Sequence, residues 1–393
     1  MRILIISNLF PPEVLGGYEI LCEQVVRGLL RLGHDVRVLT TGEAADAFPG
    51  QVDRTLSLVQ SFDSPARRWR LRRWRVDREN YRATQQMLAS FEPDLVFFWS
   101  QLRLGCGAMR AVEASRLPRM FTWNDAHLAG YLAAPWRLDA RGLAAFGLDR
   151  LMSSITLSGI DLSGGIVISQ KLKEDLLDLG LPVDDARVVY QGIPIETFPF
   201  RGPEVPLGDP PRLLYTGQLH PYKGVGTLLE AVRNLEREGR QVEVTIVGAG
   251  AAEYEAELSG VARRLASKVR FLGRLPHSSL PSIYRAHDIF VFPSIWSEPF
   301  GLTHLEAMAS GLPVVSTANG GHGEFLRDGR NALVFEPGDA AALGSQVGRL
   351  LDKPRLRRKL VEEARRHVER DFSLERYVED LETHLLEQVG RAA

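Results

Sequence analysis

Short apolar runs alternate with stretches of helical periodicity along the first half of the chain. The first run, 2–8, contains several β-branched residues and leads into a loop with a Pro-Pro pair, which is typical of a buried parallel strand. Apolar residues between Ile20 and Leu32 then recur at helical spacing up to Gly33, and 35–40 begins a second strand. This strand–helix–strand order predicts a right-handed parallel crossover. Further strands are expected at 93–100, 119–123 and 164–169.

A proline-rich passage, 192–211, interrupts this order with six prolines in twenty residues and indicates a linker. The strand–helix series then starts again. The strands expected in this second series lie at 212–218, 242–250, 269–273, 288–294 and 312–317. The two series predict an α/β protein with two facing Rossmann-like, doubly wound parallel-sheet domains at 1–200 and 201–372. We expect a final helix at 373–393 to pack back on the first domain, and ligands to bind in the cleft between the domains.

Composition narrows the class of protein without naming a partner. The 393 residues are 45% hydrophobic and 25% charged with a net charge of −1, which is typical of a globular protein and does not predict a nucleic-acid partner. The two cysteines, Cys22 and Cys106, provide neither a disulfide framework nor zinc spacing. The first apolar run is too short for a secretory signal, and no window is apolar enough to span a membrane. We therefore expect a cytoplasmic protein.

Two glycine-containing loops are candidates for anion binding. Gly16 and Gly17 precede the first helix, where backbone N–H groups can approach an anion, although an ordinary glycine turn is an equal interpretation. The loop 217–224 repeats this arrangement in the second series and adds Lys223, a mobile charge suited to a diphosphate. Taken alone, Lys223 could be a solvated lysine. The equivalent places of the two loops favour anion binding.

A third glycine pair, Gly248 and Gly250, also follows a strand. The third position of a dinucleotide fingerprint is Glu253, and the segment does not follow the first strand of a domain. We therefore predict a packing and turn role for these glycines, and a nicotinamide or flavin enzyme is disfavoured.

The segment SEPFGLTHLE, 297–306, places two glutamates eight positions apart around a Phe-Gly pair. The turn at 299–301 leads into a helix that Gly311 can cap, so Glu298 should precede the helix and Glu306 should lie inside it. The N–H groups of the first helical turn would face a phosphate or a sugar hydroxyl. Glu306 could also be a solvated helix residue, which the spacing alone does not exclude.

These residues resemble the retaining, nucleotide-sugar-dependent GT-B glycosyltransferases of the glycogen-synthase-like family 4. The resemblance runs in family order through PPEVLGGYE, GHDVRVLT, QGIP, GQLHPYKG, DIFVFPSIWSEPFGLTHLEAMASGLPVVST, GGHGEFLRDGRNALVFEPGD and the final helix. It implies transfer of a sugar from a nucleoside diphosphate, with UDP favoured over GDP, to an acceptor hydroxyl. The acceptor would be a small molecule or a lipid-linked or polysaccharide intermediate.

The resemblance also implies roles for the site residues. In the E-x7-E pattern, Glu298 would contact the transferred sugar and Glu306 would hold the ribose, while Lys223 would hold the diphosphate. Further donor-binding positions are implied at Gly16, Gly17, Gln218, Phe300, Gly301, Leu302 and Thr303. We expect a same-face displacement in which the leaving phosphate accepts the acceptor's proton. We expect neither a metal ion nor a cofactor beyond the donor, because these groups take the cation's place.

Three departures from the family pattern bear on activity. Gln218 stands where the family usually has an arginine, so one of two cations on the diphosphate is missing. Asn124 stands where many members have a histidine near the reacting centre, and His127 lies close by; the residues do not decide between the two. Gln191 and Pro194 replace a common asparagine and aspartate at the hinge.

Two segments of the first domain concern the acceptor and the membrane. The stretch 66–79 carries seven arginines and two tryptophans, which suits peripheral contact with the inner face of a membrane. A solvated helix or the wall of an anionic pocket explains it equally. The acceptor is expected near 126–150, where Tyr131, Trp136 and Phe146 supply aromatic rings.

Other functions fit the same residues. A nucleotide-sugar 2-epimerase of this fold would isomerise the donor without an acceptor. A catalytically inactive nucleotide-sugar-binding protein is conceivable because of Gln218 and Asn124. A glycoside hydrolase is disfavoured, since both glutamates would have to flank one scissile bond.

Overall fold

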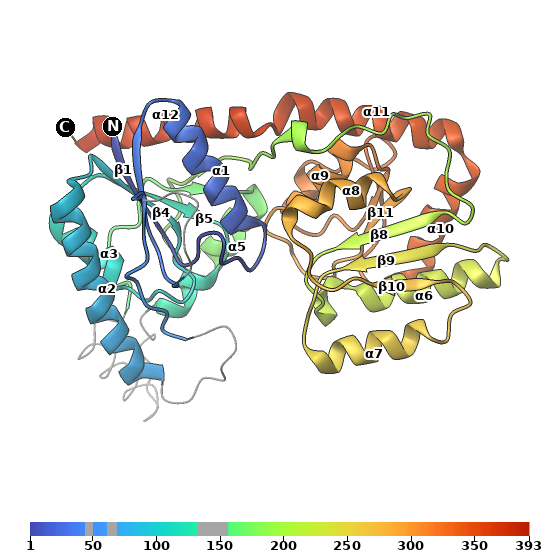
Figure 1. Ribbon diagram of the computed structural model, residues 1–393, viewed down its shortest axis with the longest axis horizontal. Coiled ribbons are helices and arrows are strands. Elements are labelled where there is room, and N and C mark those ends of the chain that lie inside the picture. Colours follow the sequence, from blue (N-terminus) through green and yellow to red (C-terminus); the bar gives the residue numbers. More distant parts are fainter. Residues whose placement is uncertain (44–49, 61–68, 133–155, 393) are drawn as a thin grey trace. The chain divides into compact units, whose positions relative to one another are not determined.

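The computed structural model describes residues 1–43, 50–60, 69–132 and 156–392, without the side chains of 69–71 and 392 (Figure 1). The chain divides into two compact units. The first contains Met1–Val189 together with Val378–Ala393, and the second contains Tyr190–Tyr377. The proline-rich passage 192–211 therefore lies in the second unit. Each unit is built around one parallel sheet, as the two strand–helix series predict.

The first unit has a seven-stranded sheet in the order β3-β2-β1-β4-β5-β6-β7. Its strands are β1 (Arg2–Ser7), β2 (Asp35–Leu39), β3 (Val52–Asp53), β4 (Leu95–Ser100), β5 (Arg119–Trp123), β6 (Ile166–Val167) and β7 (Arg187–Val188). All neighbouring pairs are parallel. The central strands β1 and β4 are buried along almost their whole length, which explains their continuous apolar sequences.

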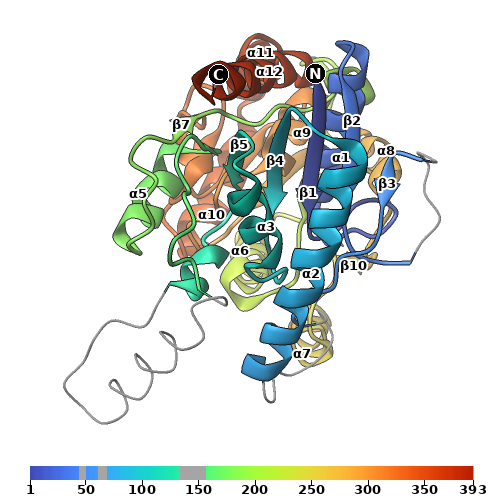
Figure 2. The same ribbon diagram turned by 90° about the vertical axis from the view of Figure 1, so that its left-hand side faces the viewer.

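Helices from both ends of the chain cover the first sheet. They are α1 (Gly17–Arg31), α2 (Trp69–Phe91), α3 (Gly107–Ser115), α5 (Gln170–Asp178) and α12 (Leu374–Ala392), with the 3₁₀ turn η1 (His127–Tyr131). A Cβ atom added to Gly28 of α1 would lie 2.7 Å from a methyl carbon of Val378, so α12 packs very closely against α1. His34 and Glu382 join the same two segments at 2.7 Å. The two chain ends lie side by side at one end of this unit (Figure 2).

The second unit has a six-stranded parallel sheet in the order β10-β9-β8-β11-β12-β13. Its strands are β8 (Arg212–Thr216), β9 (Glu243–Val247), β10 (Val269–Phe271), β11 (Ile289–Phe292), β12 (Val314–Ser316) and β13 (Leu333–Val334). Its helices are α6 (Val225–Arg237), α7 (Ala252–Ala262), α8 (Leu280–Arg285), α9 (Leu302–Ser310), α10 (Ala340–Asp352) and α11 (Pro354–Asp371). Helices α6 and α10 pack together on one face, and α8 and α9 lie on the other (Figure 1).

The predicted strands form at the expected places, and all but one of them are shorter than predicted. The run 119–123 forms β5 without change, whereas 164–169 supplies only the two residues of β6. The sequence does not predict β3 or β7, because two residues are too few to show a periodicity.

Candidate functional site

The candidate residues of the second unit gather at the carboxyl edge of its sheet. Strands β8 and β11 are neighbours, and each is followed by a loop that carries a charged side chain. Lys223 lies in the 3₁₀ turn η4 (Pro221–Lys223) after β8, and Glu298 lies after β11. Ligands of open parallel sheets bind at this edge, where the order of the strands reverses direction.

Lys223 and Glu298 form a shielded ion pair. The Lys223 Nζ donates to both carboxylate oxygens of Glu298 at 2.7 Å, and the hydroxyl of Ser294 donates to Oε1 at 2.6 Å. The side chains of Lys223 and Glu298 are only 12% and 8% exposed. The lysine charge also lies 5.1 Å from the ring centre of Trp296, which favours the cation further. This ion pair thereby links the loop after β8 to the loop after β11.

Two glycines allow these loops to approach each other. Gly224 has φ of 73°, and a Cβ atom there would lie 1.9 Å from the carbonyl oxygen of Pro293. A Cβ atom at Gly320 would lie 2.3 Å from the backbone nitrogen of Glu298 and 2.4 Å from its carbonyl oxygen. Any larger side chain would displace one loop from the other, so backbone packing fixes the position of the ion pair.

Helix α9 begins beside this pair with an open N-terminus. Gly301 precedes it with φ of 112°, and no side chain caps its first turn. The backbone N–H groups of Leu302 and Thr303 therefore have no intrahelical partner, and the helix dipole adds positive potential there. Gly311 ends the helix with φ of 83°, which confirms the predicted cap.

The side chain of Phe300, by contrast, does not face this site. It is fully buried and packs against Phe325 and Tyr190, with ring centres 5.4 and 5.9 Å away. Only the backbone of Phe300 could therefore contact a donor. Its side chain instead anchors the turn that precedes α9.

Glu306 is a buried and oriented carboxylate. The Tyr284 hydroxyl donates to its Oε2, and His277 Nε2 lies next to its Oε1, both at 2.8 Å. The Tyr284 hydroxyl is also 3.0 Å from the hydroxyl of Thr216 at the end of β8. The alternative of a solvated helix glutamate is therefore excluded. Burial opposes the charged form of His277, but the hydrogen bond and charge of Glu306 outweigh it and raise the pKa of His277.

The loop that carries Gln218 is held by its backbone. The Tyr215 hydroxyl donates to the Gln218 carbonyl oxygen at 2.9 Å, while the Gln218 side chain is exposed. A Cβ atom at Gly248 would lie 1.8 Å from the carbonyl oxygen of Gly217, and one at Gly250 would lie 1.9 Å from that of Leu219. The packing role predicted for Gly248 and Gly250 is confirmed: they let the β9 loop touch the β8 loop.

The first unit contains a separate set of predicted donor residues. Helix α1 begins at Gly17, with Gly16 as an extended cap residue. The Gly16 N–H group already donates to the Glu19 carboxylate at 2.9 Å, so this amide is occupied. No atom lies within 4 Å of a Cβ placed at Gly16. Packing therefore does not require glycine there, and a ligand has room to approach.

Asn124 and His127 are both bound within the first unit. Asn124 directly follows β5 and donates from its amide to the Trp99 carbonyl oxygen at 2.8 Å. His127 Nε2 accepts the backbone N–H of Arg103 at 3.0 Å, which places the imidazole proton on Nδ1. Burial is the main cause that lowers the pKa of His127, so the ring is neutral. Its Nε2 is not available as a base in this arrangement.

The basic stretch 66–79 has two faces where the structure describes it. Arg73 is buried with its guanidinium 3.9 Å from the ring centre of Tyr131, and Asp77 accepts the N–H of Cys106 at 2.7 Å at the start of α3. Burial raises the pKa of Asp77 to about 6. The opposite face exposes Trp74 and three arginines: Arg72, Arg75 and Arg78. Residues 66–68 lie outside the described residues, as do Trp136 and Phe146 of the predicted acceptor region.

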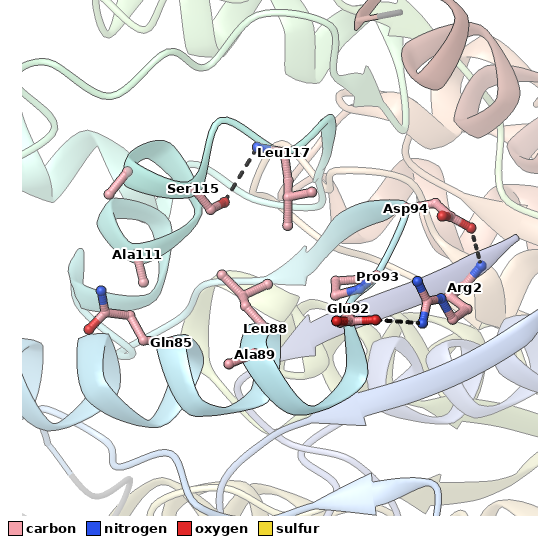
Figure 3. A pocket seen from close by; sticks show the side chains of 11 residues that line it. Arg2, Gln85, Leu88, Ala89, Glu92, Pro93, Asp94, Ala111, Ser115 and Leu117 are labelled. Atoms are coloured by element: carbon pink, nitrogen blue, oxygen red, sulfur yellow. Dashed lines mark hydrogen bonds and ion pairs between the residues drawn. The ribbon is translucent and has the colours of Figure 1, made fainter.

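A groove of about 620 Å³ lies in the first unit away from all of these residues. Figure 3 shows Gln85 and Leu88 of α2 facing Ala111 of α3, with Arg2 and Glu92 at one end joined by an ion pair at 3.4 Å. Arg2 starts β1, so the groove opens at the amino edge of the sheet. It contains no predicted site residue, and the edge is opposite to the one where α/β sheets bind ligands.

The sequence does not indicate Ser294, Tyr284 or His277, which orient the two glutamates. Tyr284 and His277 lie outside the segments that resemble the family, and Tyr284 looks like an ordinary apolar residue of a short helix, whereas Ser294 lies inside the segment 288–317. A weak signal exists for Ser294, because a polar residue directly after a buried strand marks the carboxyl edge of the sheet.

Known protein families resemble this chain over most of its length. Residues 15–197 match the model of Glycosyltransferase Family 4, and residues 199–367 match that of Glycosyl transferases group 1. The chain belongs to the GT-B glycosyltransferases. The glycosyltransferase is 26% identical over 400 residues to a glycogen synthase from Mycobacterium tuberculosis, covering 95% of this chain and 91% of the relative.

Solved structures share the whole fold of this glycosyltransferase. A sucrose-phosphate synthase from Thermosynechococcus elongatus superposes with a TM-score of 0.77 and 22% identity, covering 100% of both chains. HepE of Anabaena, in complex with UDP-glucose, superposes with a TM-score of 0.74 and 20% identity, covering 98% of this chain and 100% of that one. The predicted fold class is confirmed. In the part of the glycosyltransferase that the structure describes, no helix is both long and apolar enough to cross a bilayer.

Proposed function

We propose that the glycosyltransferase moves a sugar from a nucleoside-diphosphate sugar to an acceptor hydroxyl and retains the anomeric configuration. The observation that carries the proposal is the Lys223–Glu298 ion pair beside the open N-terminus of α9, with the oriented Glu306 inside the same helix. A UDP-sugar is the favoured donor, and the complex of HepE of Anabaena with UDP-glucose supports this choice.

Lys223 can bind a diphosphate without leaving Glu298. An ammonium group has three N–H donors, and two of them are used on the glutamate oxygens. The third donor is left for a phosphate oxygen, together with the amides of Leu302 and Thr303. Charge that develops on the leaving diphosphate is stabilised by groups already in place, which is the form of electrostatic catalysis that costs little reorganisation.

Glu298 positions the transferred sugar and does not act as a covalent nucleophile in this proposal. A carboxylate offers about four lone-pair sites, and three are used by Lys223 and Ser294. The remaining site accepts a sugar hydroxyl, while the bound lysine lowers the nucleophilicity of the carboxylate. The acceptor hydroxyl then attacks the anomeric carbon on the face that the diphosphate leaves, and a departing phosphate oxygen takes its proton.

Glu306 binds the ribose hydroxyls. Tyr284 and His277 each occupy one of its oxygens and hold the carboxylate in a single orientation, so one lone-pair site on each oxygen is left for a ribose O–H. No metal ion is needed in this proposal, because Lys223 and the dipole of α9 supply the positive potential.

Thermal unfolding in the presence of nucleotides tests the donor site directly. We expect one of UDP, GDP, ADP or dTDP to raise the unfolding midpoint, since a ligand that binds the folded state stabilises it. Glu306→Ala and Lys223→Ala should abolish the shift. The matched control variants Glu257→Ala and Lys268→Ala change exposed residues of the same unit and should keep it. A midpoint that no nucleoside diphosphate raises would contradict the proposal.

The reaction itself is tested with the donor that this panel identifies. Product formation with an acceptor panel, and nuclear magnetic resonance of the new glycosidic bond, would report both transfer and anomeric configuration. An inverted product would refute the retaining mechanism. Isomerisation of the donor without an acceptor would favour the epimerase, and binding without turnover would favour the inactive nucleotide-sugar-binding protein.

A further inference from the structure

Two buried histidines lie stacked directly beneath the start of α9. His304 belongs to α9 and His322 to the 3₁₀ turn η6 (Gly321–Glu324), and both side chains are completely buried. Their ring centres are 5.0 Å apart and their planes differ by 20°. A Cβ atom at Gly301 would lie 2.7 Å from His304 Nδ1 and 3.2 Å from His322 Cβ. The pair is therefore in contact with the residue at which the open helix terminus begins.

The neutral ring of His304 leaves one contact unmade in either tautomer. Its Nε2 lies 2.9 Å from the Ser316 hydroxyl, which lies 3.0 Å from the Phe292 carbonyl oxygen, and its Nδ1 lies 3.3 Å from the Gly301 carbonyl oxygen. A proton on Nε2 leaves Nδ1 without a hydrogen bond to Gly301, and a proton on Nδ1 turns the Ser316 hydroxyl away from Phe292. The doubly protonated ring would make all three hydrogen bonds at once.

The ring nitrogens of His322 have fewer hydrogen-bond partners than those of His304. Among the residues that the structure describes, neither of its ring nitrogens makes a hydrogen bond of ordinary geometry, and the Thr317 backbone favours its charged form. Buried polar groups without partners are rare and costly. The two ring nitrogens of His322 thus lack the hydrogen bonds that a buried imidazole normally makes. This lack indicates that the ring changes its protonation or its partners when a ligand binds beside α9.

The charged side chains around the two histidines already interact with other partners. Burial lowers the pKa of His304 well below its usual value and that of His322 to about 4, the neighbouring His322 lowers that of His304 further, and Lys223 adds a smaller effect in the same direction on both rings. The carboxylates on the surrounding elements face elsewhere: Glu298 is bound by Lys223, Glu306 by Tyr284 and His277, and Glu324 by Tyr190. The pair is therefore neutral before a ligand binds.

A diphosphate at the helix terminus would make the electrostatic potential at the two histidines more negative. The Glu298 carboxylate offsets part of the positive potential that Lys223 offers to an incoming dianion. His304 and His322 are neutral and lie against Gly301, so a dianion at the helix terminus would raise their pKa values. Their stacking permits one proton and disfavours two, because two cations 5 Å apart would repel each other.

We propose that the His304–His322 pair takes up one proton from solvent when a nucleoside diphosphate binds at the N-terminus of α9, and releases it when the diphosphate leaves. This inference rests on the donor site proposed above. No covalent bond is made or broken in the step; a solvent proton moves to a ring nitrogen of the pair. Donor affinity should consequently rise as the pH falls from 8 towards 6.

Calorimetric titration measures the proton directly. UDP-glucose, GDP-mannose and ADP-glucose are titrated into the enzyme at pH 6.5 in two buffers with different ionisation enthalpies. These donors are diphosphate diesters and bind no proton near this pH, so the difference between buffers counts protons taken up by the protein. We expect an uptake between one half and one proton for the donor that binds. Binding without proton uptake overturns the inference and leaves the donor site intact.

Variants assign the proton to the pair. His322→Phe keeps an aromatic ring in the stack, and together with His304→Gln it should remove the uptake. His277→Gln removes the other titratable histidine near Glu306; it weakens ribose binding, but the number of protons taken up per donor bound should be unchanged. Loss of uptake in His277→Gln alone would overturn the assignment, and the wild-type measurement stands even if a pair variant fails to fold. If none of the three donors binds, the proposed donor site fails and the inference fails with it.

Discussion

Replacing Lys223 by methionine tests the ion pair on which the donor site depends. Methionine keeps most of the side-chain volume and removes the charge, so the Glu298 carboxylate is left 8% exposed with a single hydrogen bond from Ser294. Removal of one partner from a buried pair costs about 3–5 kcal/mol. We expect about 3 kcal/mol here, because Ser294 still donates and the pair keeps some contact with solvent. For a unit of this size the unfolding midpoint should fall by about 6–12 °C.

A double-mutant cycle separates the charge from the packing. In the Lys223→Met background, Glu298→Gln removes the uncompensated charge and should restore about 2 kcal/mol, whereas in the wild type the same change should destabilise. Urea unfolding followed by fluorescence gives the free energies of unfolding, and the exposed control Lys268→Met should change them by less than about 0.5 kcal/mol. If Glu298→Gln lowers stability equally in both backgrounds, the two side chains do not interact and the reasoning fails.

Four further predictions follow from individual contacts. Glu306→Ala should raise the donor KM by about 10- to 100-fold, because about 1.4–2.8 kcal/mol of ribose binding is lost. The surface control Glu257→Ala should leave KM unchanged. Equal steady-state constants for the two variants would contradict the ribose role. Gly320→Ala should destabilise the enzyme and reduce turnover because its Cβ would collide with the Glu298 backbone, whereas Gly226→Ala, which meets no atom within 4 Å, should be neutral or stabilising; thermal midpoints and rates decide this. His322 has a pKa of about 4 in the folded protein and about 6.5 in the unfolded chain, so between these pH values it takes up a proton only on unfolding. The free energy of unfolding should therefore fall by about 1–2 kcal/mol from pH 6.5 to pH 5. His322→Phe should remove this loss in urea titrations, and an unchanged pH slope would refute it. If the exposed face of α2 contacts a membrane, sedimentation with anionic liposomes should deplete the wild type from the supernatant but not a variant with serine at positions 72, 75 and 78; equal recovery with and without anionic lipid would refute the contact.

The local elements of this glycosyltransferase follow from the sequence because their causes are local. A buried parallel strand needs an uninterrupted apolar run, and 119–123 supplies one that becomes β5. A helix end needs a residue that tolerates positive φ, and Gly311 provides it. The E-x7-E segment likewise predicts a carboxylate before α9 and another inside it. Each of these features depends on residues within one turn or one strand of each other.

The partners of the site residues depend on topology instead. Lys223 and Glu298 are 75 positions apart and meet because β8 and β11 are adjacent in the sheet, an order that periodicity does not reveal. Long-range packing also decided that Glu306 is held by Tyr284 and that the Phe300 ring is part of the core.

The histidine pair shows the same limit. In the sequence His304 and His322 are two unrelated residues on different elements, and only the packing of η6 against α9 stacks them in one buried place. Burial, and with it the cost of an unbonded nitrogen or an unpaired charge, is a property of the whole fold. The sequence by itself determined the longer strands and helices and the residue types that stand at their ends. The tertiary structure decided which of those residues face one another and which of them are withdrawn from water.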